Sequence, residues 1–262
     1  MAASTSSAPP VRGRFDWPWR GGPSFVTPDG SQVSLAGASL VDPALELSRP
    51  WSCGFVALVR GVRRHFTVAE AGAFDWHSTY TTIPDEVFRQ PYRGGELLLG
   101  IQHEPAHDEP GEYRAAWRGQ WFELHTRGSG PPPPADGIIQ IFDAFRLTDT
   151  PLGMLVAPRS LRQVRLEPVQ VAKQIPRIGY LTIERPGSSR IAIPEFRGHP
   201  TRHGELWRQP LGRGAHGRSR PDALVVATPT AITRLVAGSA DSTDPNEALA
   251  FLTDLDVIWE PA

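Results

Sequence analysis

Apolar and polar residues alternate with a period of two in several short stretches of the chain, most clearly over residues 164–167 and 180–184. This alternation is typical of a strand that buries one face and exposes the other. Other short runs rich in Val, Ile, Leu and aromatic residues also predict strands. The predicted strands cover residues 32–40, 52–62, 95–102, 113–117, 120–125, 137–147, 151–157, 162–173, 178–184, 223–227 and 257–259.

Helix signals are fewer and mostly short. Residues 67–74, 84–90 and 228–238 each predict a short helix, the last with Thr228 as its N-cap. The best-specified helix begins at Asp244, where Pro245 occupies the first helical position and Glu247 completes a capping box. Its predicted apolar face consists of Ala248, Leu249, Phe251 and Leu252.

The element pattern predicts a β-rich α+β fold, mainly an antiparallel curved sheet of sandwich or barrel type with a few short helices. Four consecutive prolines at 131–134 favour polyproline II, so residues 128–136 are interpreted as a linker or surface loop. We therefore expect a flexible arm over 1–14, a β-rich half over 15–127 and a second β-rich half with the C-terminal helix over 137–262. A single domain over 15–262 is the alternative.

Composition narrows the function classes. The formal net charge of the 262 residues is −1, so no overall field points to nucleic acid, membranes or acidic ligands. No apolar run approaches the length of a transmembrane helix. Cys53 is the only cysteine, which rules out an intramolecular disulfide and favours a reducing, cytoplasmic location. Lys173 is the only lysine among 27 basic residues, a bias that a GC-rich genome explains.

Residues 103–107 spell H-E-x-x-H, the letters of a zinc-protease signature. That signature requires a helix, on which the two histidines share one face and the glutamate acts as general base. Pro105 lies inside these five residues, removes a helical N–H group and biases Glu104 away from helical geometry. We therefore expect an acidic loop here and reject the zincin mechanism.

Loop histidines remain candidate metal ligands. His103 and His107 stand among several carboxylates, and a second pair with the same spacing, His199 and His203, is followed by Glu205. If the two loops met, their imidazoles could share a divalent metal such as zinc, iron or manganese. A metal-dependent hydrolase is therefore one alternative function, with a divalent metal as its cofactor.

The segment 185–220 combines basic and aromatic residues with many glycines. Such a segment can neutralise phosphates and stack bases, which makes nucleic-acid binding a second alternative. An exposed arginine-rich loop without a ligand explains the same pattern. The candidate binding residues are Arg202, Trp207, Arg208, Arg213, Arg218 and Arg220.

Motifs of the common enzyme classes are missing from the sequence: there is no G-x-S-x-G elbow and no P-loop. The expected function is therefore a non-enzymatic interaction, adaptor or assembly protein that binds another protein. This expectation involves no cofactor and no membrane.

Overall fold

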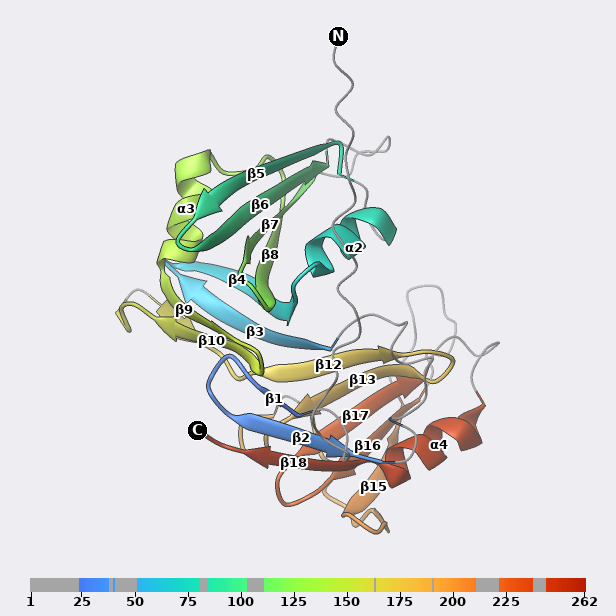
Figure 1. Cartoon of the computed structure of the whole chain (residues 1–262). Helices are drawn as coiled ribbons and strands as arrows, with labels where there is room; N and C mark the ends of the chain where they lie inside the picture. Colours follow the sequence, from blue (N-terminus) through green and yellow to red (C-terminus); the bar gives the residue numbers. More distant parts are fainter. Residues whose placement is uncertain are drawn as a thin grey trace.

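The computed structural model describes residues 24–37, 40, 51–80, 84–102, 111–162, 164–189, 191–210, 222–237 and 244–262, without the side chains of 76, 77, 79 and 80. Within these residues most of the chain is strand, and three helices accompany the sheets (Figure 1). The predicted β-rich α+β class is confirmed. The sheets are almost wholly antiparallel and are not closed into a barrel. No described helix is both long and apolar enough to cross a membrane.

The larger sheet contains strands from both sides of the proline-rich segment. β3 (Ser52–Val59) pairs with β4 (Val62–Glu70) on one side and with β12 (Gln170–Ile175) and the short strand β11 (Val164–Leu166) on the other, always antiparallel. Apart from β11, the spatial order of the sheet is β14 (His199–Pro200), β15 (Glu205–Gln209), β16 (Ala223–Ala227), β17 (Ile232–Ala237), β13 (Gly179–Glu184), β12, β3, β4, β8 (Phe122–Ser129), β7 (Glu112–Arg118), β6 (Gly95–Gln102) and β5 (Glu86–Tyr92).

The smaller sheet joins the two ends of the described chain. Its order is β18 (Asp256–Glu260), β2 (Gln32–Ala36), β1 (Ser24–Val26), β10 (Gly153–Pro158) and β9 (Phe145–Thr150). Only the β1–β10 pair is parallel. Gly153 permits this pairing, because a Cβ atom there would stand 2.0 Å from the carbonyl oxygen of Val26.

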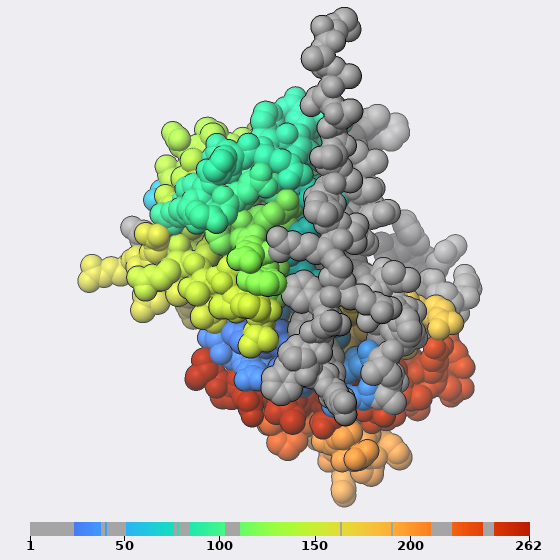
Figure 2. Space-filling view, viewed as in Figure 1, coloured from blue at the N-terminus to red at the C-terminus, as the bar shows by residue number. Residues whose placement is uncertain are grey.

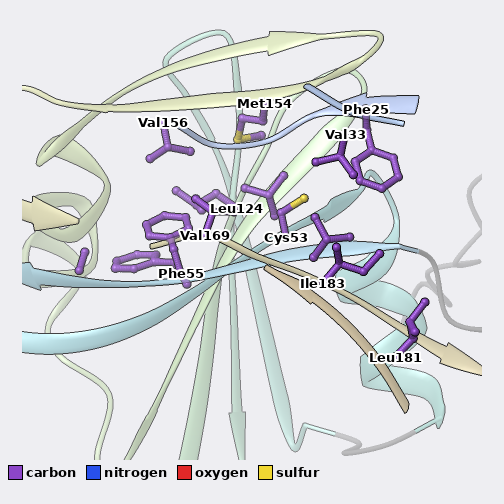
Figure 3. Packing of buried hydrophobic residues seen from close by; sticks show 14 of the residues in the cluster. Phe25, Val33, Cys53, Phe55, Leu124, Met154, Val156, Val169, Leu181 and Ile183 are labelled. Carbon is purple, nitrogen blue, oxygen red and sulfur yellow. The ribbon is translucent and has the colours of Figure 1, made fainter. Parts of the chain in front are cut away.

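The main hydrophobic core lies between the two sheets. Cys53 and Phe55 of β3 point toward Val33 of β2 and Met154 of β10 (Figure 3). Helices α3 (Ala135–Asp143) and α4 (Pro245–Asp254) extend the same core. Their buried members are Ile138, Ile141, Phe142, Ala248, Phe251 and Leu252.

The strand predicted over 137–147 is wrong in its first part, where α3 forms and β9 begins only at Phe145. Ile138, Ile141 and Phe142 are spaced three and four residues apart and are all buried, which is the helical rather than the strand period. The β-branched isoleucines favoured the strand interpretation, but the helix places all three apolar side chains in the core.

Three predicted short helices are also wrong. Residues 67–70 belong to β4, which is held between β3 and β8, and helix α2 (Ala73–Tyr80) starts later. Residues 86–92 form β5, a strand paired with β6. At 228–238 the Thr228 hydroxyl accepts the amides of Thr230 and Ala231, as an N-cap would, but the chain then continues into β17. A threonine turn and an N-cap give the same sequence signal.

The C-terminal helix is confirmed as α4. Asp244 is its N-cap and accepts the amide of Asn246, and Pro245 is the first helical residue. Ala248, Phe251 and Leu252 are buried, whereas Leu249 is 38% exposed and does not belong to the buried face.

Candidate functional site

Of the four histidines predicted to bind metal, the structure describes His199 and His203. His103 and His107 are outside the described residues, but they fall between Gln102, which ends β6, and Glu112, which starts β7. His199 lies in β14, at the opposite end of the strand order. His203 is half-buried, with its Nδ1 3.4 Å from the Oδ1 of Asp256. Within the described ranges, no group of three or more His, Cys, Asp or Glu side chains could hold a metal. The shared metal site stays a prediction.

The candidate nucleic-acid segment is described only in part, and Arg213, Arg218 and Arg220 lie outside the described residues. Arg202 is exposed, and Arg208 forms an ion pair with Asp222. Trp207 is buried, and its indole N–H donates to the carbonyl oxygen of Phe196 at 2.8 Å. Its ring is therefore a packing element and is not presented to a base. Nucleic-acid binding through this segment stays a prediction.

The most strongly perturbed carboxylate is Glu123, which is fully buried in β8. Its Oε1 accepts the Gly72 amide at 2.6 Å and the Nε of Arg118, and its Oε2 accepts the Phe74 amide at 2.8 Å. The Nε2 of His125 stands 3.0 Å from Oε2. These contacts place a negative charge at the start of α2, where the helix dipole favours it. With both oxygens occupied by donors, Glu123 anchors α2 and is not available as a catalytic base.

The acidity of Glu123 makes stability depend on pH. Burial alone would raise the pKa, but the contact with His125, the positive charge of Arg118 and the Gly72 amide lower it to about 2. The folded state thus holds this proton less tightly than the unfolded chain, so the stabilisation is present above about pH 4.5 and is lost as pH falls toward about 2.

Between about pH 5 and about pH 2, we expect the free energy of unfolding of the wild-type protein, measured with urea, to fall by about 3 kcal/mol because of Glu123 alone. Other carboxylates also titrate in this window, so the Glu123→Gln variant is the control. The difference in free energy of unfolding between wild type and variant should shrink as the pH falls. A difference that stays constant with pH would contradict the assignment.

The other chemically notable side chains are buried. Burial raises the pKa of the Cys53 thiol to about 12, which keeps it protonated and unreactive. Burial also lowers the pKa of Lys173 to about 8, and its Nζ lies 5.7 Å from the centre of the Trp51 ring. Both side chains belong to strands of the larger sheet, and Cys53 is part of the main core.

A surface groove of about 400 Å³ lies at the free end of the β3–β4 hairpin. Its floor comes from strand pairing, since Arg165 of β11 stands opposite Leu58 of β3, and Leu58 stands opposite Arg63 of β4. Side chains at directly opposed positions share one face of a sheet. The groove is lined by Leu58, Arg60, Gly61, Leu161, Arg162, Val164 and Arg165.

Local sequence builds both walls of this groove. Arg60 and Gly61 form the two-residue hairpin turn with φ of 50° and 80°, a turn that requires positive φ at both positions. The other wall is the loop that leads from β10 into β11, which projects from the left edge of the molecule in Figures 1 and 2. Leu161 in this loop is 85% exposed and Leu58 is 43% exposed. The groove therefore exposes two large apolar side chains to water.

The arginines of the groove differ in their partners. Arg63, which stands opposite Leu58, forms an ion pair with Glu167 through two hydrogen bonds of 3.1 Å. Arg60 donates a hydrogen bond to Gln140 of α3. Arg162 and Arg165 are exposed, and neither has an ion pair or side-chain hydrogen bond within the described structure. The groove therefore presents two uncompensated guanidinium groups beside two exposed leucines. We call these four residues, Leu58, Leu161, Arg162 and Arg165, the arginine–leucine groove.

Sequence reasoning placed these four residues in or beside predicted strands and did not select them. The apolar run from Phe55 to Val59 gave no signal that Leu58 would be exposed while its neighbours are buried. The adjacency of Leu58 and Arg165 depends on long-range pairing of β3 with β11 and was not visible in the sequence.

Comparison with known proteins gives no functional lead, since no protein-family model, curated protein or solved structure matches the chain. The function must therefore be argued from the groove itself.

Proposed function

We propose that the protein is a non-enzymatic binding or adaptor protein. In this proposal the arginine–leucine groove binds a segment of a partner protein that combines acidic residues with large apolar ones. The observation that carries this proposal is the pairing of two uncompensated arginines, Arg162 and Arg165, with the exposed side chains of Leu58 and Leu161. A reducing cytoplasm, suggested by the single cysteine, is the proposed location.

The charge of the groove selects the partner's chemistry. A guanidinium group offers a planar fork of donors that matches a carboxylate, and its pairing with one strengthens in a partly desolvated groove. Arg63 already shows this geometry with Glu167 on the same sheet face. Arg162 and Arg165 lack such a partner in the described structure, so an acidic segment would supply the carboxylates that they can bind.

The leucines supply the apolar part of the interaction. Covering a leucine side chain removes apolar surface from water and contributes about 1.5–3 kcal/mol when burial is complete. Arginine is among the residues enriched at the energetic centre of protein interfaces, so Arg162 and Arg165 are expected to carry more of the binding energy than the leucines. The groove is open to solvent, since Leu58 and Leu161 are exposed, and this suits an extended peptide segment better than an enclosed small ligand.

The composition of the groove also favours binding over catalysis. Its lining residues include no His, Cys, Asp, Glu, Ser or Lys that could act as nucleophile or general base near neutral pH. Arginine remains protonated in proteins, so its role here is recognition of negative charge.

The test is selection of displayed short random peptides on the immobilised full-length protein. We expect enrichment of peptides that combine Asp or Glu with Leu, Ile or Phe. We expect the same peptides to lose most of their binding to the Arg162→Glu/Arg165→Glu variant, because carboxylates would then face carboxylates.

The matched control is Arg202→Glu, which reverses an exposed arginine outside the groove and should leave peptide binding unchanged. Circular dichroism checks that each variant folds. A selection that enriches no acidic–apolar peptide, or peptides that bind the double variant and the wild type equally, would overturn the proposal. If peptide binding is lost in Arg202→Glu instead, the binding site lies in the segment 185–220 and the proposal for the groove is wrong.

A further inference from the structure

The larger sheet has a strand position beside β11 that no described strand fills. β11 pairs with residues Ala57–Val59 of β3, whereas β12 pairs with Ser52–Gly54 of the same strand. The next strand, β13, follows β12 and ends with Glu184 opposite Gln170. β13 therefore stops before it reaches β11, and the outer edge of β11 has no strand neighbour in the described part of the sheet.

The backbone groups on this outer edge follow from the pairing register. The Glu167 amide donates to the Val56 carbonyl oxygen at 2.7 Å, which makes these two residues a hydrogen-bonded antiparallel pair. Such pairs alternate along a ladder, so Arg165 also bonds to β3, while the N–H and C=O groups of Val164 and Leu166 point away from it.

One of these outward groups is already used within the molecule, because the Val164 amide donates to the Ser160 carbonyl oxygen at 3.0 Å. The Leu166 amide and the carbonyl oxygens of Val164 and Leu166 have no backbone partner among the described residues. A strand edge of this kind is a template for a further strand.

We propose that the acidic segment binds by strand addition, as an extended peptide that pairs with the outer edge of β11 through the Leu166 amide and carbonyl groups. This inference rests on the proposed function of the arginine–leucine groove. Alternate side chains of the added strand would lie on the face that carries Arg165 and Leu58, where the uncompensated charge selects Asp or Glu. The loop bearing Leu161 and Arg162 leads directly into the same edge, so groove and edge form one continuous surface.

The test compares two substitutions at Leu166, with a peptide obtained by the selection above as the probe. Leu166→Pro removes the outward amide and leaves the Arg165 and Glu167 bonds to β3 intact, while Leu166→Val keeps the amide and loses a similar part of the side chain. We expect Leu166→Pro to weaken peptide binding about five- to tenfold, as the loss of a hydrogen bond does, and Leu166→Val to change it less than about twofold.

A second measurement does not depend on the folding of a variant. Amide hydrogen exchange of the wild-type protein, followed by NMR, should show Leu166 becoming protected by about tenfold or more when the peptide is bound. If a peptide binds through Arg162 and Arg165 but Leu166 exchange is unchanged and the two variants bind alike, strand addition is overturned and the proposed function stands. If no peptide is selected, both are overturned.

Discussion

Glu123→Gln is expected to lower the free energy of unfolding by about 3–5 kcal/mol, because it removes one charged partner from a buried, hydrogen-bonded cluster. Glutamine replaces one acceptor oxygen by an NH₂ group, which would then face donors such as the Phe74 amide. It also leaves the charge of Arg118 partly uncompensated and the start of α2 without its carboxylate. Urea denaturation followed by circular dichroism measures the loss.

The matched control is Glu96→Gln, which changes another carboxylate of the same network. The Oε2 of Glu96 lies 3.6 Å from Arg89 and 3.7 Å from Arg118, and its side chain is 36% exposed. Exposed ion pairs contribute about 0–1 kcal/mol, so this variant should resemble the wild type. If Glu123→Gln falls within about 1 kcal/mol of the wild type, Glu123 does not anchor α2.

Phe66→Ala is expected to cost about 3–5 kcal/mol, which is typical of removing a buried phenylalanine. Phe66 of β4 is 1% exposed, stacks on Phe55 with ring centroids 5.3 Å apart, and meets Phe145 of β9 edge-on at 5.1 Å. These contacts join the larger sheet to the smaller one, so the substitution would leave a cavity between the two sheets. Thermal and urea unfolding give the change in stability.

Phe88→Ala provides the comparison, because Phe88 lies on β5 and is 52% exposed. It should cost less than about 1 kcal/mol, since much of its ring is already in contact with water. Equal losses for Phe66→Ala and Phe88→Ala would contradict the placement of the core between the two sheets.

Period-two alternation of apolar and polar residues located two strands, although in β13 the polar positions Thr182 and Glu184 are buried like the apolar ones. Residues 164–167 and 180–184 correspond to β11 and β13. The capping residues Asp244 and Pro245 located α4, since a cap is a local interaction that needs no distant partner. Where the signal was a short apolar run, as at 137–147, length and composition did not distinguish strand from helix, and the core position of Ile138, Ile141 and Phe142 decided it.

The candidate site was less predictable because it depends on pairing between distant segments. Leu58 and Arg165 become neighbours only when β11 docks on β3, and the open position beside β11 exists only because β13 ends at Glu184. The anchoring of α2 by Glu123 likewise joins residues that are far apart in sequence. A single sequence carries no signal for such contacts. The histidine and arginine motifs, in contrast, are local and can be recognised from the sequence alone.

If charge in the arginine–leucine groove selects the partner, reversing the charge of the groove should reverse the charge of the peptide that it prefers. Fluorescence titration would measure an acidic peptide from the selection, and the same peptide with lysine at its acidic positions, against wild type and Arg162→Glu/Arg165→Glu. We predict that the variant binds the acidic peptide about 30-fold or more weakly than the wild type and prefers the lysine peptide. Unchanged affinity of the variant for the acidic peptide, or no gain for the lysine peptide, would show that the charge of the groove does not select the partner.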